Sequence, residues 1–235
     1  GLVQRYEMAV PTGTILFESN TARSLHDANS ITHGEPETIR WIDRLPEGTI
    51  LWDIGANVGV YSLYAAVVRQ KTVMVFEPGA ASHAALCKNI EINCLDELIQ
   101  PFCLAFAKQT SIDRLYLANT GAGHSMHGFG QPQSAHGKIN YQYRQSVTGY
   151  SIDQFCKIFQ PKLPDYVKLD VDGIELSIIE GGENTLRNHV KSIIVEIEDG
   201  ETTSNGDEII RHLNDLGFRE RRSKYFSLRN VIFDK

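Results

Sequence analysis

Acidic side chains close three short apolar stretches of this sequence, where they could bind polar or cationic groups of a ligand. They are Asp53 in "TILWDI" (49–54), Glu77 in "TVMVFEP" (72–78) and Asp170 in "DYVKLDVDG" (165–173). Short apolar runs of this kind are typical of buried parallel strands. In open α/β sheets, ligands bind beyond the carboxyl ends of the strands. We therefore expect these three carboxyl groups to lie near one binding site.

A turn with two glycines follows the first of these stretches and leads into a predicted helix over 57–70. Gly55 and Gly59 match only part of the dinucleotide fingerprint G-x-G-x-x-G, because Asn57 stands where a second close glycine would be required. Gly55 allows the backbone to turn sharply near a ligand, and a helix N-terminus favours a negative group. We assign the turn to cofactor binding through Asp53, Gly55, Ala56, Asn57 and Gly59.

Glu77 indicates a ribose site, because it follows Gly55 by 22 residues. A carboxylate in this position accepts hydrogen bonds from a ribose diol. Glu77 and the following Pro78 do not separate a nicotinamide cofactor from S-adenosyl-L-methionine (SAM), since both contain ribose. Asp53 adds negative charge that repels a pyrophosphate and attracts an ammonium or a sulfonium. SAM carries both cations, so we predict SAM as the cofactor; a nicotinamide-dependent oxidoreductase is the alternative.

The remaining elements predict an α/β fold, because strand-like stretches alternate with stretches of helical periodicity. The expected strands are 13–19, 49–54, 72–78, 99–107, 111–118, 143–150, 165–173 and 191–199, with a last strand or hairpin arm near the C-terminus. The expected helices are 35–45, 57–70, 81–94, 151–159 with Ser151 as its cap, 174–188 interrupted near Gly181 and Gly182, and 206–217. We expect a single domain over 1–235, with an N-terminal extension over 1–46, a Rossmann-like core over 47–235 and a lid or substrate loop over 119–145.

Composition and charge exclude several other classes of protein. The chain has 235 residues and a net charge of −6, which argues against a nucleic-acid-binding surface. No apolar run has the length of a membrane span, and no secretory signal is visible, so we expect a cytoplasmic location. The cysteines have no C-x-x-C spacing and are expected to be reduced thiols in the core: Cys87, Cys94, Cys103 and Cys156.

Several separate blocks of the sequence, between residues 47 and 198, resemble the FkbM-type methyltransferases. The blocks are "WDIGANVGVYS", "VMVFEPGAASHAALCKNIEIN", "SIDQF", "VKLDVDGIELSIIEGGENTL" and "IIVEIE". The resemblance implies a SAM-dependent O-methyltransferase of class I fold: a Rossmann-like, mostly parallel seven-stranded sheet with an antiparallel C-terminal strand and helices on both faces. The family usually reads K-x-D-x-E-G-x-E. Here Lys168, Asp170, Asp172, Gly173 and Glu175 match it, with Asp172 in place of the middle glutamate.

Lys168, Asp170 and Asp172 alternate along one predicted strand, so we expect them on one face of it. In the functional interpretation, Asp170 and Lys168 are candidate catalytic residues, and Asp170 lies at the methionyl end of the cofactor or near the acceptor hydroxyl. In the alternative, a Lys168–Asp170 ion pair only braces the strand end. Asp170 or Asp172 could also combine with Glu196 or Glu198 around a metal ion. The sequence does not establish the number of ligands, so a divalent metal is not predicted.

His124 and His127 are candidate general bases for methyl transfer to a hydroxyl. That reaction is an in-line displacement, in which the protein aligns the nucleophile, excludes water and helps to remove a proton. Both histidines lie in the glycine-rich stretch "GAGHSMHGFG", which could close over a substrate. A solvent-exposed position is the alternative for each of them. We expect the acceptor to be a hydroxyl of a small molecule, natural product or glycan; a non-catalytic SAM-binding protein is the remaining alternative.

Overall fold

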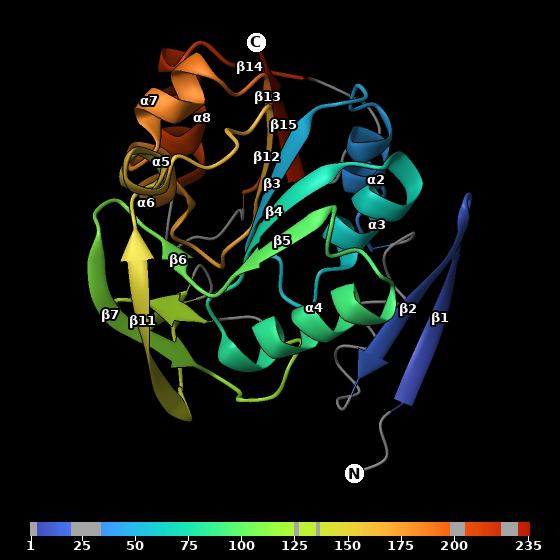
Figure 1. Ribbon diagram of the computed structural model, residues 1–235. Coiled ribbons are helices and arrows are strands. Elements are labelled where there is room, and N and C mark those ends of the chain that lie inside the picture. The colour runs from blue at the N-terminus through green and yellow to red at the C-terminus, as the bar shows by residue number, and fades with distance from the viewer. Residues whose placement is uncertain (1–3, 20–33, 125–126, 135–136, 198–204, 222–229) are drawn as a thin grey trace.

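The computed structural model (Figure 1) describes residues 4–19, 34–124, 127–134, 137–197, 205–221 and 230–235. Its centre is a seven-stranded sheet in the order β14-β15-β13-β12-β3-β4-β5. The strands are β3 (Ile50–Ile54), β4 (Thr72–Phe76), β5 (Ile99–Phe102), β12 (Tyr166–Leu169), β13 (Ser192–Glu196), β14 (Arg219–Glu220) and β15 (Asn230–Asp234). All neighbours pair in parallel except β15, which is antiparallel to both β13 and β14. The predicted mostly parallel sheet with an antiparallel C-terminal strand is confirmed.

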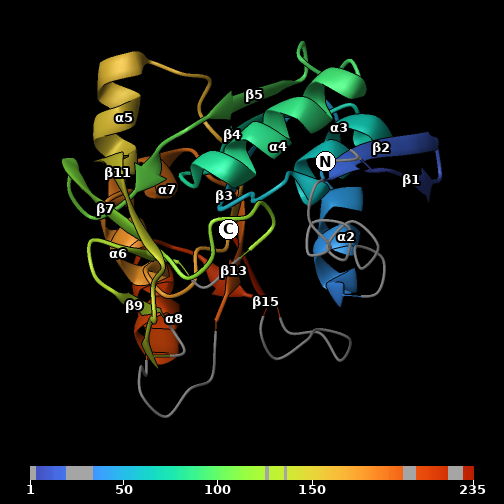
Figure 2. The same ribbon diagram turned by 90° about the horizontal axis from the view of Figure 1, so that it is seen from below.

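Helices cover both faces of this sheet (Figures 1 and 2). One face carries α2 (Pro36–Asp43), α3 (Val60–Arg69) and α4 (Ala80–Ile92). The other carries α5 (Ile152–Phe159), α6 (Glu175–Glu180), α7 (Glu183–Asn188) and α8 (Asn205–Asp215). Successive side chains of a strand point to opposite faces, so Val73 and Val75 enter the first core while Met74 and Phe76 enter the second. This double burial explains the apolar sequence of the central strands.

A second sheet, of four strands in the order β6-β11-β7-β8, was not predicted. Its strands are β6 (Ala105–Phe106), β7 (Ser111–Leu117), β8 (Gly128–Phe129) and β11 (Tyr143–Tyr150), and a small pair, β9 (Gln133–Ser134) and β10 (Gly137–Lys138), lies in the predicted loop 119–145. The prediction of one strand over 99–107 is therefore wrong. The chain leaves the main sheet after Phe102, and β6 pairs with β11 instead. Leu104 stays buried across this break, so the apolar run gives no sign of it.

An N-terminal hairpin of β1 (Gln4–Val10) and β2 (Gly13–Ser19) packs against α4. The predicted strand over 13–19 is confirmed, whereas β1 was not predicted. The backbone N–H groups of Leu16 and Glu18 donate to the side-chain oxygens of Asn93 and Asn89, each at 2.8 Å. Asn89 of α4 and Asn93, which caps the C-terminus of that helix, thus satisfy backbone groups along one edge of β2 and attach the hairpin to the core.

Helix boundaries follow local chemistry. Helix α3 begins at Val60 rather than near residue 57, because Gly59 has a φ of 88° and turns the chain just before the helix. The cap predicted for α5 is confirmed, since the Ser151 hydroxyl accepts a hydrogen bond from the backbone N–H of Gln154 at 3.2 Å. The interruption predicted near Gly181 is also confirmed, and it separates α6 from α7.

The cysteines are free, as predicted, but the prediction that they lie in the core is wrong, because none of the four is fully buried. Cys94 and Cys103 are exposed, while Cys87 and Cys156 are half-buried. Cys94 follows the end of α4 and Cys103 follows β5, where the apolar pattern of each element ends. Within the described ranges, no helix is long and apolar enough to cross a membrane.

Candidate functional site

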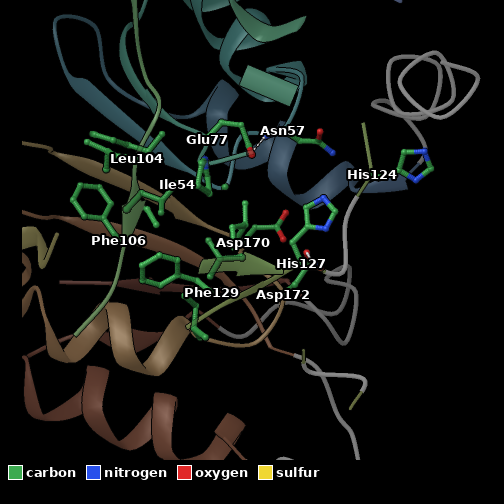
Figure 3. Close-up of a pocket in the computed structure, with 17 residues that line it drawn as sticks. Ile54, Asn57, Glu77, Leu104, Phe106, His124, His127, Phe129, Asp170 and Asp172 are labelled. Carbon is green, nitrogen blue, oxygen red and sulfur yellow. Dashed lines mark hydrogen bonds between the residues drawn. The ribbon is translucent and has the colours of Figure 1, made fainter. Parts of the chain in front are cut away.

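A cavity opens at the carboxyl ends of β12, β3 and β4, three adjacent strands of the main sheet (Figure 3). The chain runs from β3 outward to β4 and β5 on one side, and β12 and β13 lie on the other, so the cavity stands at the point where the strand order reverses. Its polar lining consists of Asn57, Glu77, His124, His127, Asp170 and Asp172. Its apolar lining includes Ile54, Phe76, Leu104, Phe106, Leu115, Phe129 and Ile174.

The turn after β3 forms the floor of this cavity and has a tightly constrained backbone. Gly55, Asn57 and Gly59 have φ values of 83°, 53° and 88°, in the left-handed region that glycine tolerates best. A Cβ on Gly55 would lie 1.7 Å from the carbonyl oxygen of Asp170, so the turn and the end of β12 are in direct contact. The backbone N–H of Gly55 donates to the carbonyl of Phe76 at 2.9 Å, which ties the turn to β4 as well.

The residues predicted for this turn do not all face the cavity. Gly55 and Asn57 line it, whereas Ala56 is buried in the core and Gly59 caps α3. Asp53 lies behind the turn with 1% of its surface exposed, where the Ser62 hydroxyl donates to its Oδ2. Burial raises the pKa of Asp53 above its usual value. This position does not favour the predicted direct contact between Asp53 and a ligand.

Glu77 follows β4, lines the cavity and is 7% exposed. Its Oε2 accepts a hydrogen bond from the N–H of Asn57 at 2.9 Å, and its Oε1 accepts one from the N–H of Gly79 at 2.7 Å. Burial raises the pKa of Glu77 to about 7, although these two backbone hydrogen bonds act in the opposite direction. The carboxyl is therefore fixed beside the turn, as a ribose-binding acid requires. Pro78 lines the same part of the cavity.

Lys168 and Asp170 form an ion pair at the end of β12, with 2.8 Å between Lys168 Nζ and Asp170 Oδ2. Burial alone would raise the pKa of Asp170, but the Lys168 ammonium and a hydrogen bond with Glu196 hold it below its usual value. The side chain of Lys168 is 4% exposed, and the acids around it raise its pKa despite burial. Asp170 is thus an ionised group at the cavity wall, and Lys168 supports it from behind.

The prediction that Asp172 shares a strand face with Lys168 and Asp170 is wrong. Strand β12 ends at Leu169, and Asp172 has a φ of 62°, so the chain has already turned. The turn is held by Glu175, whose Oε1 accepts hydrogen bonds from the N–H groups of Val171 at 3.2 Å and Gly173 at 3.1 Å. Asp172 still lines the cavity, and its Oδ2 accepts a hydrogen bond from the backbone N–H of His127 at 3.3 Å.

Both predicted histidines line the cavity, on the side away from Leu104 and Phe106 (Figure 3). Burial, together with the nearby His124, lowers the pKa of His127 to about 4, so its ring is neutral at physiological pH. The segment that carries them is attached to the cofactor turn, because Asn57 Nδ2 donates to the carbonyl of Gly123 at 3.2 Å. The N–H of Gly123 in turn donates to the Ser82 hydroxyl at 3.2 Å.

Three further ionisable side chains adjoin Lys168 and Asp170: Glu35, Tyr61 and Glu196. Glu196 was predicted only as a possible metal ligand, and neither Glu35 nor Tyr61 was predicted to be near the site. The Lys168 ammonium lies 5.0 Å from the centre of the Tyr61 ring. Glu35 accepts a hydrogen bond from the Thr38 hydroxyl at 3.0 Å and is also hydrogen-bonded to Tyr61. The acidic end of β13 was visible in the sequence, but the approach of Glu196 to Glu35 was not.

The donor set near Asp170 gives no support for a metal ion. In the described part of the chain, no group of three or more histidine, cysteine, aspartate or glutamate side chains could hold one. Asp170 is occupied by the Lys168 ammonium and by a hydrogen bond with Glu196. Glu198, the other acid considered for such a site, lies outside the described residues.

The order of the strands and the position of the cavity define a Rossmann-like fold with a ligand site at its switch point. The crystal structure of a methyltransferase FkbM from Methylobacillus flagellatus has a similar fold, with a TM-score of 0.52 and 14% identity, over 81% of this chain and 44% of that chain. The sequence model of the methyltransferase FkbM domain matches residues 53–220. The chain therefore belongs to the FkbM methyltransferase family, as its sequence blocks predicted.

A characterised relative is the hexuronic acid methyltransferase AglP of Haloferax volcanii. The two proteins are 26% identical over 170 residues, which cover 71% of this chain and 64% of that protein. This chain thus spans less than two-thirds of the length of either protein to which it is compared.

Proposed function

We propose that this chain binds SAM across the carboxyl ends of β4, β3 and β12 and transfers its methyl group to a hydroxyl of a small molecule or glycan. The observation that carries the proposal is the placement of two fixed carboxyl groups on either side of a glycine turn. Glu77 stands at the end of β4, Asp170 stands beyond β12, and Gly55 lies between them with no room for a side chain. Membership of the FkbM family supports the same reaction.

The residues that line the cavity complement the adenine, ribose and methionyl parts of SAM in turn. Phe76, Leu104 and Phe106 offer apolar surface for the adenine. Glu77 offers a carboxylate for the two ribose hydroxyls, and the backbone of Gly55 lines the cavity where we place the sulfur. Asp170 is an ionised group on the side of the turn opposite Glu77, and we propose that it binds the ammonium group at the methionyl end of SAM.

The chemistry requires a new O–C bond as the C–S bond breaks, and the proton of the hydroxyl must reach a base. SAM supplies an activated methyl group on a sulfonium. We propose His127 as the base, with His124 as the second candidate, because both line the cavity and His127 is neutral. Lys168 acts on the reaction only through Asp170. Residues 119–145 are proposed as the lid, because Gly123 contacts the cofactor turn through Asn57.

A glycan is the acceptor class that we favour among possible hydroxyl compounds. The support is the relative AglP, which is named as a hexuronic acid methyltransferase. A methyl-transfer screen with labelled SAM, against acidic sugars, neutral sugars and natural-product alcohols, would identify the acceptor. We also propose a cytoplasmic location, which the four free cysteines support, since thiols persist in reducing compartments.

The affinity for SAM should depend on the ionisation of Glu77. Because the pKa of Glu77 is about 7 in the empty site, and ribose hydroxyls donate to the ionised form, binding must displace a proton at lower pH. We expect the wild-type affinity, relative to that of Glu77→Gln, to fall about tenfold between pH 8 and pH 6. Isothermal titration calorimetry of both proteins at each pH measures this ratio of affinities. Changes in the protonation of SAM itself affect both proteins equally and cancel in the ratio.

Glu175→Gln is the matched control, because burial also raises the pKa of Glu175 to about 7 but its carboxyl does not line the cavity. This variant should keep the wild-type pH dependence even if its affinity changes. A ratio that stays constant from pH 6 to pH 8 would show that Glu77 does not hold the ribose.

A further inference from the structure

A cluster of ionisable side chains lies beside the cavity and contains more acids than bases. We call it the acid cluster; its members are Glu35, Asp53, Tyr61, Lys168, Asp170 and Glu196. They come from the residue before α2, from β3, α3, β12 and β13, and from the residue after β12. Of these six groups only Asp170 lines the cavity.

Lys168 compensates only one of the four carboxyl groups. Its Nζ is 2.8 Å from Asp170 Oδ2 and 4.0 Å from Asp53 Oδ1, so the close ion pair is with Asp170. Isolated charges are costly to bury, and the remaining carboxyls therefore tend to retain protons. Burial and the charge of Asp170 raise the pKa of Glu196 to about 9, so Glu196 is protonated at neutral pH and can donate a hydrogen bond to Asp170.

Hydrogen bonds satisfy the other two carboxyl groups of the cluster, Glu35 and Asp53, only in part. Burial raises the pKa of Glu35, but this carboxyl accepts hydrogen bonds from Thr38 and Tyr61. Asp53 accepts one from Ser62, while its Oδ1 is buried without a hydrogen-bond partner among the described atoms. The cluster is thus not satisfied internally. Glu175 of α6 also faces Asp170, but backbone N–H groups hold its carboxyl.

We propose that Glu196 stores a proton while the cofactor site is empty and releases it when the ammonium group of SAM binds at Asp170. The inference rests on the proposed function, which assigns that ammonium to Asp170. Lys168 and Asp170 neutralise each other, so a second buried cation requires a second anion. Glu196 is the carboxyl beside Asp170: the parallel strands β12 and β13 pair Leu169 with Val195, so the residues that follow this pair, Asp170 and Glu196, lie side by side at the edge of the sheet. The hydrogen bond between their carboxyl groups also contributes to their pKa shifts. Its carboxylic acid becomes a carboxylate, the proton passes to solvent, and the ammonium takes its place as the compensating charge.

Glu196 is therefore a positioning residue that acts through Asp170. Because cofactor binding releases a proton from Glu196, the affinity for the cofactor increases as the pH rises toward 9. Above this pH, which is about the pKa of Glu196 in the protein without cofactor, Glu196 has already lost the proton and the effect ends. The affinity of the wild type relative to Glu196→Gln should increase between pH 7 and pH 9, by at most about tenfold per pH unit. A purely structural role of Glu196 would leave this ratio constant.

The test is a calorimetric titration of the full chain at pH 8 with S-adenosylhomocysteine, the demethylated product, which keeps the ribose and the ammonium. Repeating the titration in buffers of different ionisation enthalpy gives the number of protons released. The wild type should release up to about one proton more than Glu196→Gln. Glu196→Asp, which restores a titratable carboxyl, should recover most of the release.

Glu37→Gln is the matched control, because Glu37 is another buried carboxyl, hydrogen-bonded to Asn230, outside the acid cluster. It should release as many protons as the wild type. If folded Glu196→Gln releases as many protons as the wild type, the inference is overturned, although SAM binding stands. If Glu196→Gln does not fold, Asp170→Asn takes its place, and equal release by Asp170→Asn and the wild type overturns the inference. If the wild type binds neither S-adenosylhomocysteine nor SAM, the proposed function fails first and the inference fails with it.

Discussion

Replacing Gly55 with alanine should weaken SAM binding by at least about 100-fold, or about 2.7 kcal/mol. The added Cβ would lie 1.7 Å from the carbonyl oxygen of Asp170, a distance that no relaxation of a side chain can correct. The φ of 83° adds backbone strain for any residue other than glycine. The turn must therefore move away from the end of β12, and the floor of the cavity moves with it. Calorimetry on the folded variant measures the loss.

Gly48→Ala separates steric conflict from backbone strain. Gly48 has a comparable φ of 71°, but nothing lies within 4 Å of its hypothetical Cβ. Thermal unfolding should show a modest loss of stability for Gly48→Ala, and its affinity for SAM should equal that of the wild type. If Gly55→Ala binds SAM as tightly as Gly48→Ala does, the cofactor does not rest on this turn.

Lys168→Met should destabilise the fold by about 3–5 kcal/mol at pH 8. The substitution removes the ammonium that compensates Asp170 and leaves Asp53, which is 1% exposed, beside an apolar side chain. An uncompensated buried charge accounts for most of this cost. Chemical unfolding followed by circular dichroism measures it. Lys191→Met is the control: Lys191 forms an ion pair of 2.7 Å with Asp165 at the surface, and its loss should cost far less.

The penalty of Lys168→Met should shrink as the pH falls toward 4. In the wild type the pKa of Asp170 is held below its usual value of about 4, so the stability that the ion pair contributes is present from pH 8 down to about pH 4 and is lost only below that, as the pH falls through the folded pKa. Without the ammonium, burial raises the folded pKa of the carboxyls, and the variant becomes less stable as the pH rises. A penalty that is equal at pH 8 and pH 4 would contradict the structural account of Lys168.

The central elements of the fold could be predicted because their signals are local. Strands buried on both faces, such as β3 and β4, are short apolar runs, and Ser151 marks the start of α5 through a hydroxyl that caps the helix. The second sheet could not be predicted in this way. Its strands pair across distant parts of the chain, as β6 does with β11, and the break between β5 and β6 carries no turn residue.

The sequence predicts those residues of the candidate site that directly follow a strand. Glu77 and Asp170 follow β4 and β12, and parallel strands bring their carboxyl ends to one edge of the sheet. Asp172 was misplaced because alternation cannot show where a strand stops. The approach of Glu35 to Lys168 and Asp170 could not be predicted either, since it joins residues more than 130 positions apart in the sequence.

The most direct test of the account is a calorimetric titration of the wild-type chain with SAM at pH 8, beside an identical titration with NAD. Binding of SAM at one site, with no heat of binding for NAD, is the result that the two carboxyl groups and the intervening glycine turn predict. Binding of NAD in preference to SAM, or no binding of SAM at any concentration tested, would contradict the assignment of this cavity.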